Sequence, residues 1–244
     1  DSMGNVIYGY DGTVPVTLDQ SVVHSGAVRR GAPNTFIVGD MPFLSYSVSV
    51  RETVANAGRL YKEANVDAVK MEGGRRIVPH VKAVVDAGMV VQGHIGITPQ
   101  SVAAQGGFGA QGRTLEAALV LLEDALALQD AGIASLVLEG LPAESAKLIT
   151  ERLRIPTIST GAGPACTAQS LNFMDVLGIY QMFTPKFVKK YAVLGDQIKS
   201  AIGTYAAEIR NGTYPAPEHC YSLREGEGDK LAAWSAAHPL AARA

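Results

Sequence analysis

Charged side chains stand at the ends of several apolar stretches, and their types and spacing suggest chemistry. In the stretch V-D-A-V-K-M-E, residues 66–72, Lys70 and Glu72 share one face because strand side chains alternate. Three further strand-like stretches end in titratable residues, which are Asp40, His94 and Glu139. In a barrel the carboxyl ends of the strands converge on one rim, so we expect these side chains to share a pocket.

Carboxylates gathered in one pocket raise one another's pKa and need a compensating charge. A hard divalent cation such as Mg²⁺ provides one, because it prefers oxygen ligands and takes only one or two protein carboxylates. A remaining acid can then serve as a base, and Lys70 can hold a substrate carboxylate. Asp1 and Ser2 would add another strand end if a strand precedes them in the fold.

Each of these residues also has a simpler interpretation. A single charge at a strand end is more often a solvated loop residue. Several in register, with a lysine among them, favour a functional site. His94 lies in G-H-I-G, where it either hydrogen-bonds to backbone or contacts a substrate, and the sequence leaves both open.

The elements that position these residues alternate between strand and helix. Five stretches are typical of buried strands and a sixth follows: 35–40, 66–72, 89–94, 134–139, 155–160 and 168–173. Between two of them, Leu115, Leu119, Leu122 and Leu126 recur with helical spacing. Strands joined by crossover helices form a parallel sheet, either an open doubly wound sheet or a closed barrel. The number of strands and their charged ends favour the (β/α)₈ barrel.

One long helix is predicted near the end of the chain, over residues 187–210. Its apolar stripe comprises Phe187, Tyr191, Leu194, Ile198, Ile202, Tyr205 and Ile209. Such a stripe suits packing on the barrel or on a neighbouring subunit.

The segment 107–112 matches G-x-G-x-x-G, which is the pattern of a dinucleotide-binding loop. That fingerprint requires a strand directly before it, whereas the preceding residues are typical of a loop or a short helical turn. We therefore interpret the glycine-rich segment as a rim loop able to cover a substrate.

Composition excludes several classes of protein. The net charge is −2 and no basic stripe stands out, which disfavours a nucleic-acid partner. No apolar run approaches the about 18 residues of a membrane span, and no signal peptide opens the chain, so we expect a cytoplasmic protein without a membrane partner. Cys166 and Cys220 have no metal-ligand spacing.

Several motifs together resemble the ketopantoate hydroxymethyltransferase family, in the family's order up to His219. They are D1-S-M-G, G-Y-D-G-T-V-P-V-T17, G39-D-M-P-F43, V69-K-M-E-G-G74, G93-H-I-G-I-T-P-Q100, L138-E139, T160-G-A-G-P164, P185-K-F-V-K-K-Y191 and Y214-P-A-P-E-H219. The resemblance implies a TIM barrel of the phosphoenolpyruvate/pyruvate superfamily, with one barrel domain over 1–219 and a tail over 220–244. The family has a strand, a helix and another strand before its G-D-S motif, so we expect this chain not to close the barrel alone.

The resemblance also implies an activity, a metal and an assembly. Members transfer a hydroxymethyl group from 5,10-methylenetetrahydrofolate to 3-methyl-2-oxobutanoate in pantothenate biosynthesis, depend on Mg²⁺ and form homodecamers that exchange the C-terminal helix. By motif, Asp1 and Asp40 resemble the metal ligands, with Glu72 completing the site directly or through water. Asp1, Ser2, Asp40 and Lys70 resemble the contacts to the 2-oxo acid, to which we add His94. Glu139 resembles the general base.

The chemistry also follows from the residues. Glu139 would remove a proton beside the carbonyl of an α-keto acid held by Mg²⁺ and Lys70, and the enolate would attack a one-carbon unit. One rival is an isocitrate-lyase-like Mg²⁺ barrel enzyme, whose cysteine-bearing K-x-C-G-H-like loop is missing from this sequence. The other is a non-catalytic barrel that serves in assembly or ligand sensing.

Overall fold

The chain consists of two compact units. The computed structural model describes residues 1–239. Residues 1–193 form the first unit, and the second begins at Leu194. The domain boundary expected from the sequence, after residue 219, therefore falls inside the second unit. Residues 240–244 of the expected tail lie outside the described residues.

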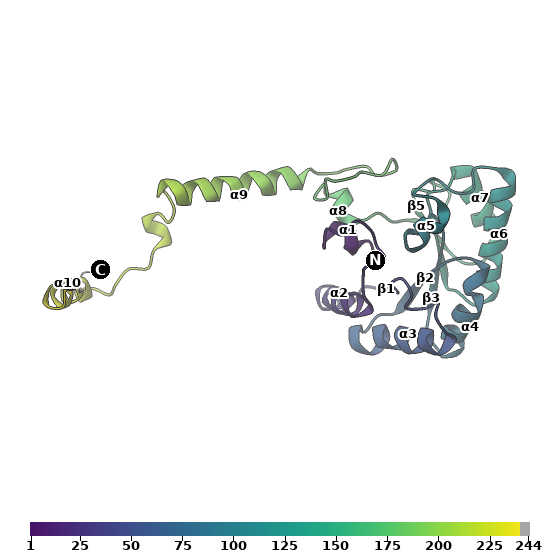
Figure 1. Ribbon diagram of the computed structural model, residues 1–244, viewed down its shortest axis with the longest axis horizontal. Helices are drawn as coiled ribbons and strands as arrows, with labels where there is room; N and C mark the ends of the chain where they lie inside the picture. Colours follow the sequence, from purple (N-terminus) through teal and green to yellow (C-terminus); the bar gives the residue numbers. More distant parts are fainter. Residues whose placement is uncertain (240–244) are drawn as a thin grey trace. The chain divides into compact units, whose positions relative to one another are not determined.

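The first unit is built on a six-stranded parallel sheet (Figure 1). Its strands are β1 (Val38–Asp40), β2 (Ala68–Glu72), β3 (Val91–Gly96), β4 (Ser135–Glu139), β5 (Thr157–Thr160) and β6 (Ala168–Gln169). Each of the six strands predicted from the sequence is confirmed, although most are shorter than the apolar stretch that marks them. The pairing is parallel throughout.

The order of the strands decides between the two architectures considered from the sequence. The strands lie side by side in chain order from β1 to β6. A doubly wound sheet reverses its order at a switch point, and this sheet has none, so that alternative is wrong. Within residues 1–239 the two edge strands are not paired with each other. The structure is therefore a half-barrel, and a complete eight-stranded barrel is not seen.

Helices connect the strands and cover the outside of the curved sheet (Figure 1). The longer ones are α2 (Leu18–Gly31), α3 (Val50–Ala64), α4 (Val78–Asp86), α6 (Leu115–Asp130) and α7 (Ala143–Arg152). Short helical turns are α1 (Met3–Val6), η1 (Arg75–Ile77), η2 (Pro99–Ser101), α5 (Val102–Gln105) and α8 (Phe173–Val176). None of the helices within residues 1–239 has the length and hydropathy to cross a bilayer.

Polar caps and apolar faces explain where the helices form. In α2 the Gln20 backbone N–H donates to Thr17 Oγ1 at 3.2 Å while the Thr17 N–H donates to Gln20 Oε1 at 2.9 Å, which is a capping box. In α6 the Ala117 N–H donates to the side chain of Thr114. The buried face of α6 recurs at helical spacing and includes Leu122 and Leu128.

The register of the strands brings the charged residues next to one another. Asp40 lies opposite Lys70, and Glu72 lies opposite His94. Glu139 lies opposite Gly96, two residues beyond His94. Since side chains two residues apart in a strand share a face, all of these charged groups point to the same side of the sheet. Val69 and Met71 point to the helices and are fully buried.

Gly96 shows why the end of β3 needs a glycine. Its φ is +100°, and an added Cβ would lie 2.2 Å from the carbonyl oxygen of Glu139. The next residue, Ile97, donates its N–H to that same oxygen at 2.8 Å. A side chain at position 96 would therefore push β3 away from the end of β4 and from Glu139.

The predicted terminal helix begins later than the sequence suggested. Helix α9 spans Leu194–Asn211, and η3 (Pro217–His219) and α10 (Glu227–Ala237) follow it in the second unit. The prediction that the helix starts at Phe187 is wrong. The backbone N–H of Tyr191 donates to the Val176 carbonyl at 2.8 Å, and the Phe187 ring packs on Gly161, so these residues are held by the first unit instead.

Candidate active site

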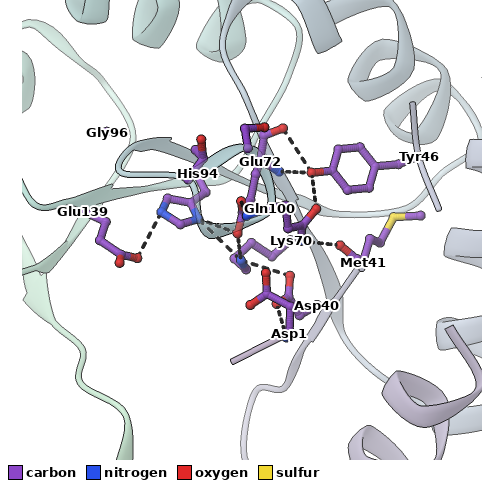
Figure 2. Close-up of polar contacts among 12 residues, drawn as sticks. Asp1, Asp40, Met41, Tyr46, Lys70, Glu72, His94, Gly96, Gln100 and Glu139 are labelled. Carbon is purple, nitrogen blue, oxygen red and sulfur yellow. Dashed lines mark hydrogen bonds and ion pairs between the residues drawn. The ribbon is translucent and has the colours of Figure 1, made fainter. Parts of the chain in front are cut away.

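Six titratable side chains meet at the carboxyl ends of β1 to β4 and at the start of the chain (Figure 2). We call them the charged cluster: Asp1, Asp40, Lys70, Glu72, His94 and Glu139. The sequence predicted all six as site residues, and the structure brings all six together. The seventh, Ser2, is exposed at the start of α1 and lines a small cavity of about 200 Å³ together with Asp1 and Asp40.

Lys70 lies at the centre of the cluster. Its Nζ is 3.0 Å from Asp40 Oδ1 and 2.9 Å from Glu72 Oε1. Burial alone would lower the pKa of Lys70, but the charges of Asp40 and Glu72 outweigh that effect and raise it well above its usual range. Lys70 is therefore a permanent cation, and its ammonium group has three donors, of which these carboxylates use two.

Glu72 is the most deeply buried carboxylate of the cluster, with 1% of its side chain exposed. Burial alone would raise its pKa, but the charges of Lys70 and His94 lower the pKa of Glu72 far below its usual range. Both of its oxygens are occupied: Oε1 by Lys70 and His94, and Oε2 by the backbone N–H of Gln100 at 3.2 Å. Glu72 is thus held as an anion by three neighbours.

His94 connects two carboxylates. Its Nδ1 is 3.2 Å from Glu72 Oε1 and its Nε2 is 3.3 Å from Glu139 Oε2. Burial alone would lower the pKa of His94, but the charge of Glu72 raises it to about 8. At neutral pH the ring is therefore mostly an imidazolium, which can hold both carboxylates at once. The sequence left open whether His94 bonds to backbone or contacts a substrate. In the structure its ring contacts two side chains of the site and not the backbone.

Glu139 is more accessible than Glu72 or His94, with 20% of its side chain exposed. It stands at the end of β4, and His94 fixes one of its oxygens. A general base needs a carboxylate that is held in place and can still reach a substrate. Glu139 meets both requirements.

Asp1 carries a buried oxygen without a partner, and one buried oxygen of Asp40 contacts only Lys70. These are Asp1 Oδ2 and Asp40 Oδ1, the second of which is in ion-pair contact with Lys70. The other Asp40 oxygen, Oδ2, is 2.7 Å from the backbone nitrogen of Asp1. Burial alone would raise the pKa of Asp40, but the charge of Lys70 lowers it. Buried anionic oxygens without donors are expected to bind a cation or a substrate donor.

The fit of a metal ion differs among the three predicted ligands. Within residues 1–239, no three His, Cys, Asp or Glu side chains are arranged so that they could hold a metal ion. Lys70 occupies the space between Asp40 and Glu72, and Glu72 has no free oxygen. Asp1 Oδ2, by contrast, is buried without a partner, and Asp40 Oδ1 contacts only Lys70. Two carboxylates suffice for Mg²⁺, so its fit rests on this pair.

Two buried residues that the sequence did not single out support the cluster. Tyr46 accepts the Glu72 backbone N–H at 3.2 Å and donates to Gln100 Oε1 at 2.7 Å. Gln100 Nε2 donates in turn to the carbonyl of Met41, the residue after Asp40, at 2.9 Å. The two side chains therefore brace the loops that follow β1, β2 and β3. Gln100 was part of the quoted G-H-I-G-I-T-P-Q motif but had no predicted role.

Two further expectations from the sequence can be compared with the structure. The segment 107–112 follows α5, a short helix, and not a strand, so the context of a dinucleotide-binding loop is missing. Cys166 is buried and accepts a contact from Thr150 Oγ1 at 3.7 Å, outside the charged cluster. Cys220 lies in the second unit and is exposed.

Comparison with known proteins connects this site to one family. The family model described as ketopantoate hydroxymethyltransferase matches residues 1–217. A 3-methyl-2-oxobutanoate hydroxymethyltransferase of Syntrophobacter fumaroxidans is 53% identical over 231 residues, which cover 95% of this chain and 82% of that protein. One of Heliobacterium modesticaldum is 54% identical over 223 residues, covering 91% and 81%.

A solved structure agrees with the fold. The crystal structure of a phosphonopyruvate hydrolase has a TM-score of 0.52 over 98% of this chain and 85% of the other, at 12% identity. At this identity the likeness concerns the fold alone. The sequence matches are much stronger, and they cover nearly the whole chain. The chain therefore belongs to the ketopantoate hydroxymethyltransferase family and is a transferase enzyme.

Proposed function

We propose that the chain transfers a hydroxymethyl group from 5,10-methylenetetrahydrofolate to 3-methyl-2-oxobutanoate, giving 2-dehydropantoate in pantothenate biosynthesis. In the overall balance, one water molecule is consumed and tetrahydrofolate is released. The observation that carries the proposal is the placement of Lys70 between Asp40 and Glu72, with Glu139 held beside them through His94. The names of the relatives and the family model support it.

Lys70 and Asp1 are proposed to orient the 2-oxo acid. The third N–H of the Lys70 ammonium is available for the substrate carboxylate, and the cation remains charged over the whole physiological range. Ser2 is close enough to Asp1 and Asp40 to share the lining of the adjoining small cavity. A substrate held by these groups would present the carbon next to its carbonyl to Glu139.

Glu139 is proposed to remove the proton from C3 of 3-methyl-2-oxobutanoate. The pair of electrons left on the substrate becomes the enolate. Water cleaves the two carbon–nitrogen bonds of the methylene group of the donor, which gives tetrahydrofolate and formaldehyde. The enolate then forms the new carbon–carbon bond to the formaldehyde carbon, whose carbonyl oxygen becomes an alkoxide. The protonated Glu139 can then return its proton to the new hydroxymethyl oxygen. His94 keeps the carboxylate in position through its Nε2 contact at 3.3 Å.

Mg²⁺ is proposed as the metal of the site, held by Asp1 and Asp40. The unpartnered buried oxygen Asp1 Oδ2 and the adjacent carboxylate of Asp40 support the assignment. When bound there, the ion supplies a Lewis acid that polarises the keto group of the substrate. Glu72 is occupied by Lys70, His94 and Gln100, and its proposed part in the site is to fix the two cations.

A homodecamer is proposed as the assembly. The apolar stripe of α9 supports self-association, because Ile198, Ile202 and Ile209 are about half exposed or more in the described chain. The cytoplasmic location expected from the sequence stays a prediction.

The proposed function is tested by a turnover assay on the full chain. The protein is incubated with 3-methyl-2-oxobutanoate and 5,10-methylenetetrahydrofolate, with Mg²⁺ or with a chelator, and 2-dehydropantoate is measured. Product that depends on Mg²⁺ is expected. Binding of Mg²⁺ and the oxo acid without any folate-dependent product would instead favour the non-catalytic rival.

A further inference from the structure

Thr160 lies next to Glu139 at the carboxyl end of the sheet. It is the last residue of β5, and the register pairs it with Glu139, the last residue of β4. Paired residues of neighbouring strands lie about 5 Å apart, and their side chains point to the same side of the sheet. The side chain of Thr160 therefore extends by one strand the row of inward-facing groups that forms the charged cluster.

The burial pattern of β5 agrees with this direction. Thr157 and Ser159 face the helices and are buried, with 0% and 1% exposure. Ile158 and Thr160 alternate with them and are partly buried. Because side chains alternate along a strand, Thr160 faces the interior of the half-barrel, where the charged cluster lies.

The hydroxyl of Thr160 differs from the other two hydroxyls of β5 in its hydrogen bonding. Thr157 Oγ1 is 2.9 Å from Thr150 Oγ1, and Ser159 Oγ accepts the backbone N–H of Ala162 at 3.0 Å. Within residues 1–239 the hydroxyl of Thr160 makes no hydrogen bond. Two hydroxyls of the strand therefore support the fold, and the one that faces the site is left for a ligand.

The backbone holds Thr160 in a defined position. Its carbonyl accepts the N–H of Gly140, the residue after Glu139, at 2.9 Å. The chain then turns at Gly161, whose φ is +69°, and the ring of Phe187 packs on that glycine. A hydroxyl fixed in this way needs little reorganisation to bind a group that becomes charged during a reaction.

The order of the groups along the sheet places the reacting carbon near Thr160. The residues proposed to hold the carboxylate and keto groups of the oxo acid are Lys70, Asp1 and Asp40, which meet at β1 and β2. Glu139, which is proposed to remove the proton from C3, lies on β4. A substrate held by these groups extends from β1 toward β4, so the substituents of its C3 lie nearest to β5.

The new carbon–carbon bond creates a negative oxygen that needs a hydrogen-bond donor. When the enolate attacks formaldehyde, the electrons of the carbonyl group move to its oxygen, which becomes an alkoxide. The Nε2 of His94 is directed at Glu139. Val137 and Ile158, the pair that precedes Glu139 and Thr160 on the inner face, are apolar. At the carboxyl ends of β4 and β5 in the described chain, the hydroxyl of Thr160 is the side-chain donor that remains.

We propose that the Thr160 hydroxyl is a catalytic hydrogen-bond donor to the oxygen of the transferred one-carbon unit, first as an aldehyde oxygen and then as an alkoxide. Thr160 keeps its proton throughout, and the proton that completes the hydroxymethyl group comes from Glu139. The inference rests on the proposed function and adds the group that stabilises the product oxygen. Such a donor accelerates the step in which the charge develops, which is transfer and not enolate formation.

Thr160→Val tests the proposal, because it removes the hydroxyl and keeps a β-branched side chain of similar shape. Single-turnover assays use 3-methyl-2-oxobutanoate and Mg²⁺, with either 5,10-methylenetetrahydrofolate or free formaldehyde as the one-carbon source. Formation of 2-dehydropantoate should slow by about 10- to 100-fold with both sources, the range expected for a hydrogen bond to a charged group. Thr160→Ser keeps the hydroxyl and should restore most of the rate. Thr35→Val, at an exposed threonine outside the site, is the matched control and should react as wild type does.

A second readout separates this role from support of the base. Deuterium exchange at C3 requires proton removal by Glu139 but forms no alkoxide on a one-carbon unit. Thr160→Val should therefore exchange at the wild-type rate, which also shows that the variant is folded. Equal losses of exchange and transfer would overturn the proposal, because the hydroxyl would then only support Glu139. Transfer at the wild-type rate in Thr160→Val would overturn it as well.

The two one-carbon sources distinguish the role of Thr160 from the proposed function. A wild-type chain that forms 2-dehydropantoate from formaldehyde but not from 5,10-methylenetetrahydrofolate overturns the proposed function. In that case a selective loss of transfer from formaldehyde in Thr160→Val leaves the role of Thr160 standing. A wild-type chain that uses the folate donor, with full transfer in Thr160→Val, overturns the role of Thr160 alone.

Discussion

The charged cluster places charged side chains inside the protein, whereas helix α9 exposes apolar side chains to solvent. In the cluster, Glu72 and His94 are buried and Lys70 is partly buried, and each of these charged groups has an oppositely charged partner within 3.3 Å. In α9, Ile202 and Ile209 are apolar and exposed, at 63% and 48%. Burying a charge costs free energy unless the charge is well paired. An exposed isoleucine gains no hydrophobic stabilisation until another surface covers it.

The difference shows which side chains find their interaction partners within the chain itself. The cluster is nearly complete within the first unit, and the unpartnered oxygen of Asp1 indicates a ligand. The apolar stripe of α9 is not covered by other residues of the described second unit. We therefore expect it to pack against another protein surface. Substitutions should therefore damage the folding of one region and the association of the other.

Lys70→Met should give the largest effect. It leaves Asp40 and Glu72 as buried anions without their shared cation, and breaking a buried ion pair in this way costs about 3–5 kcal/mol of unfolding free energy. Chemical denaturation measures the loss. Lys147→Met is the control, because this lysine is exposed and its pair with Glu151 should contribute less than about 1 kcal/mol. Equal free energies of unfolding for the two variants would contradict the claim that the cluster stabilises the fold more than an exposed ion pair does.

The pH dependence of stability should identify His94. Its pKa in the folded chain is about 8 and its unfolded value is about 6.5. The folded state therefore binds the proton more tightly, so the stabilisation is full below about pH 6.5 and is lost as the pH rises through about 8. The expected loss is about 2 kcal/mol, on the basis of about 1.4 kcal/mol for each pKa unit.

Denaturation between pH 6 and 9, without added divalent cation, measures this loss. His94→Gln should flatten the curve in that window, since glutamine does not titrate. A decline of the same size in the variant would assign the effect to another group.

Tyr46→Phe should have a smaller effect. It removes the hydroxyl that bonds to Gln100 and to the backbone of Glu72, with an expected loss of about 1 kcal/mol in unfolding free energy. Because Glu72 is then less well fixed, kcat should fall more than the affinity for the 2-oxo acid. Tyr221→Phe, at a fully exposed tyrosine, is the control and should match wild type in both measurements.

Ile202→Ser in α9 should have the smallest effect on folding and a clear effect on assembly. The residue is exposed in the described chain, so its own contribution to the stability of the chain should stay within about 0.5 kcal/mol. Sedimentation should show weaker self-association. Ala207→Ser, on the opposite face of the same helix, should leave the mass of the sedimenting assembly unchanged. If both variants sediment as wild type does, the stripe is not an association surface.

The sequence predicted the strands well and singled out charged residues that the structure brings together, for a physical reason. Parallel strands are short apolar runs, and a charge such as Lys70 or Glu139 at the end of such a run is conspicuous. The parallel register then brings these residues together without further information. The half-barrel itself follows from the strand order, which no local pattern reveals.

Tyr46 and Gln100 could not be predicted in the same way. Both lie in or at the edge of loops without hydrophobic periodicity, and their role depends on contacts between residues 26 to 59 positions apart. The start of α9 was missed for a similar reason. The helical pattern continues back to Phe187, but tertiary contacts of residues 187 and 191 hold that segment against the first unit.

Proton removal by Glu139 is the most direct test of the chemistry assigned to the cluster. Deuterium exchange at C3 of 3-methyl-2-oxobutanoate is followed by NMR in D₂O, with Mg²⁺ and without folate, in wild type, Glu139→Gln and the exposed control Glu144→Gln. Glu139→Gln should slow exchange by about 10²- to 10⁴-fold while binding of the oxo acid changes little. Exchange at the wild-type rate in Glu139→Gln would show that another group is the base and would contradict the account.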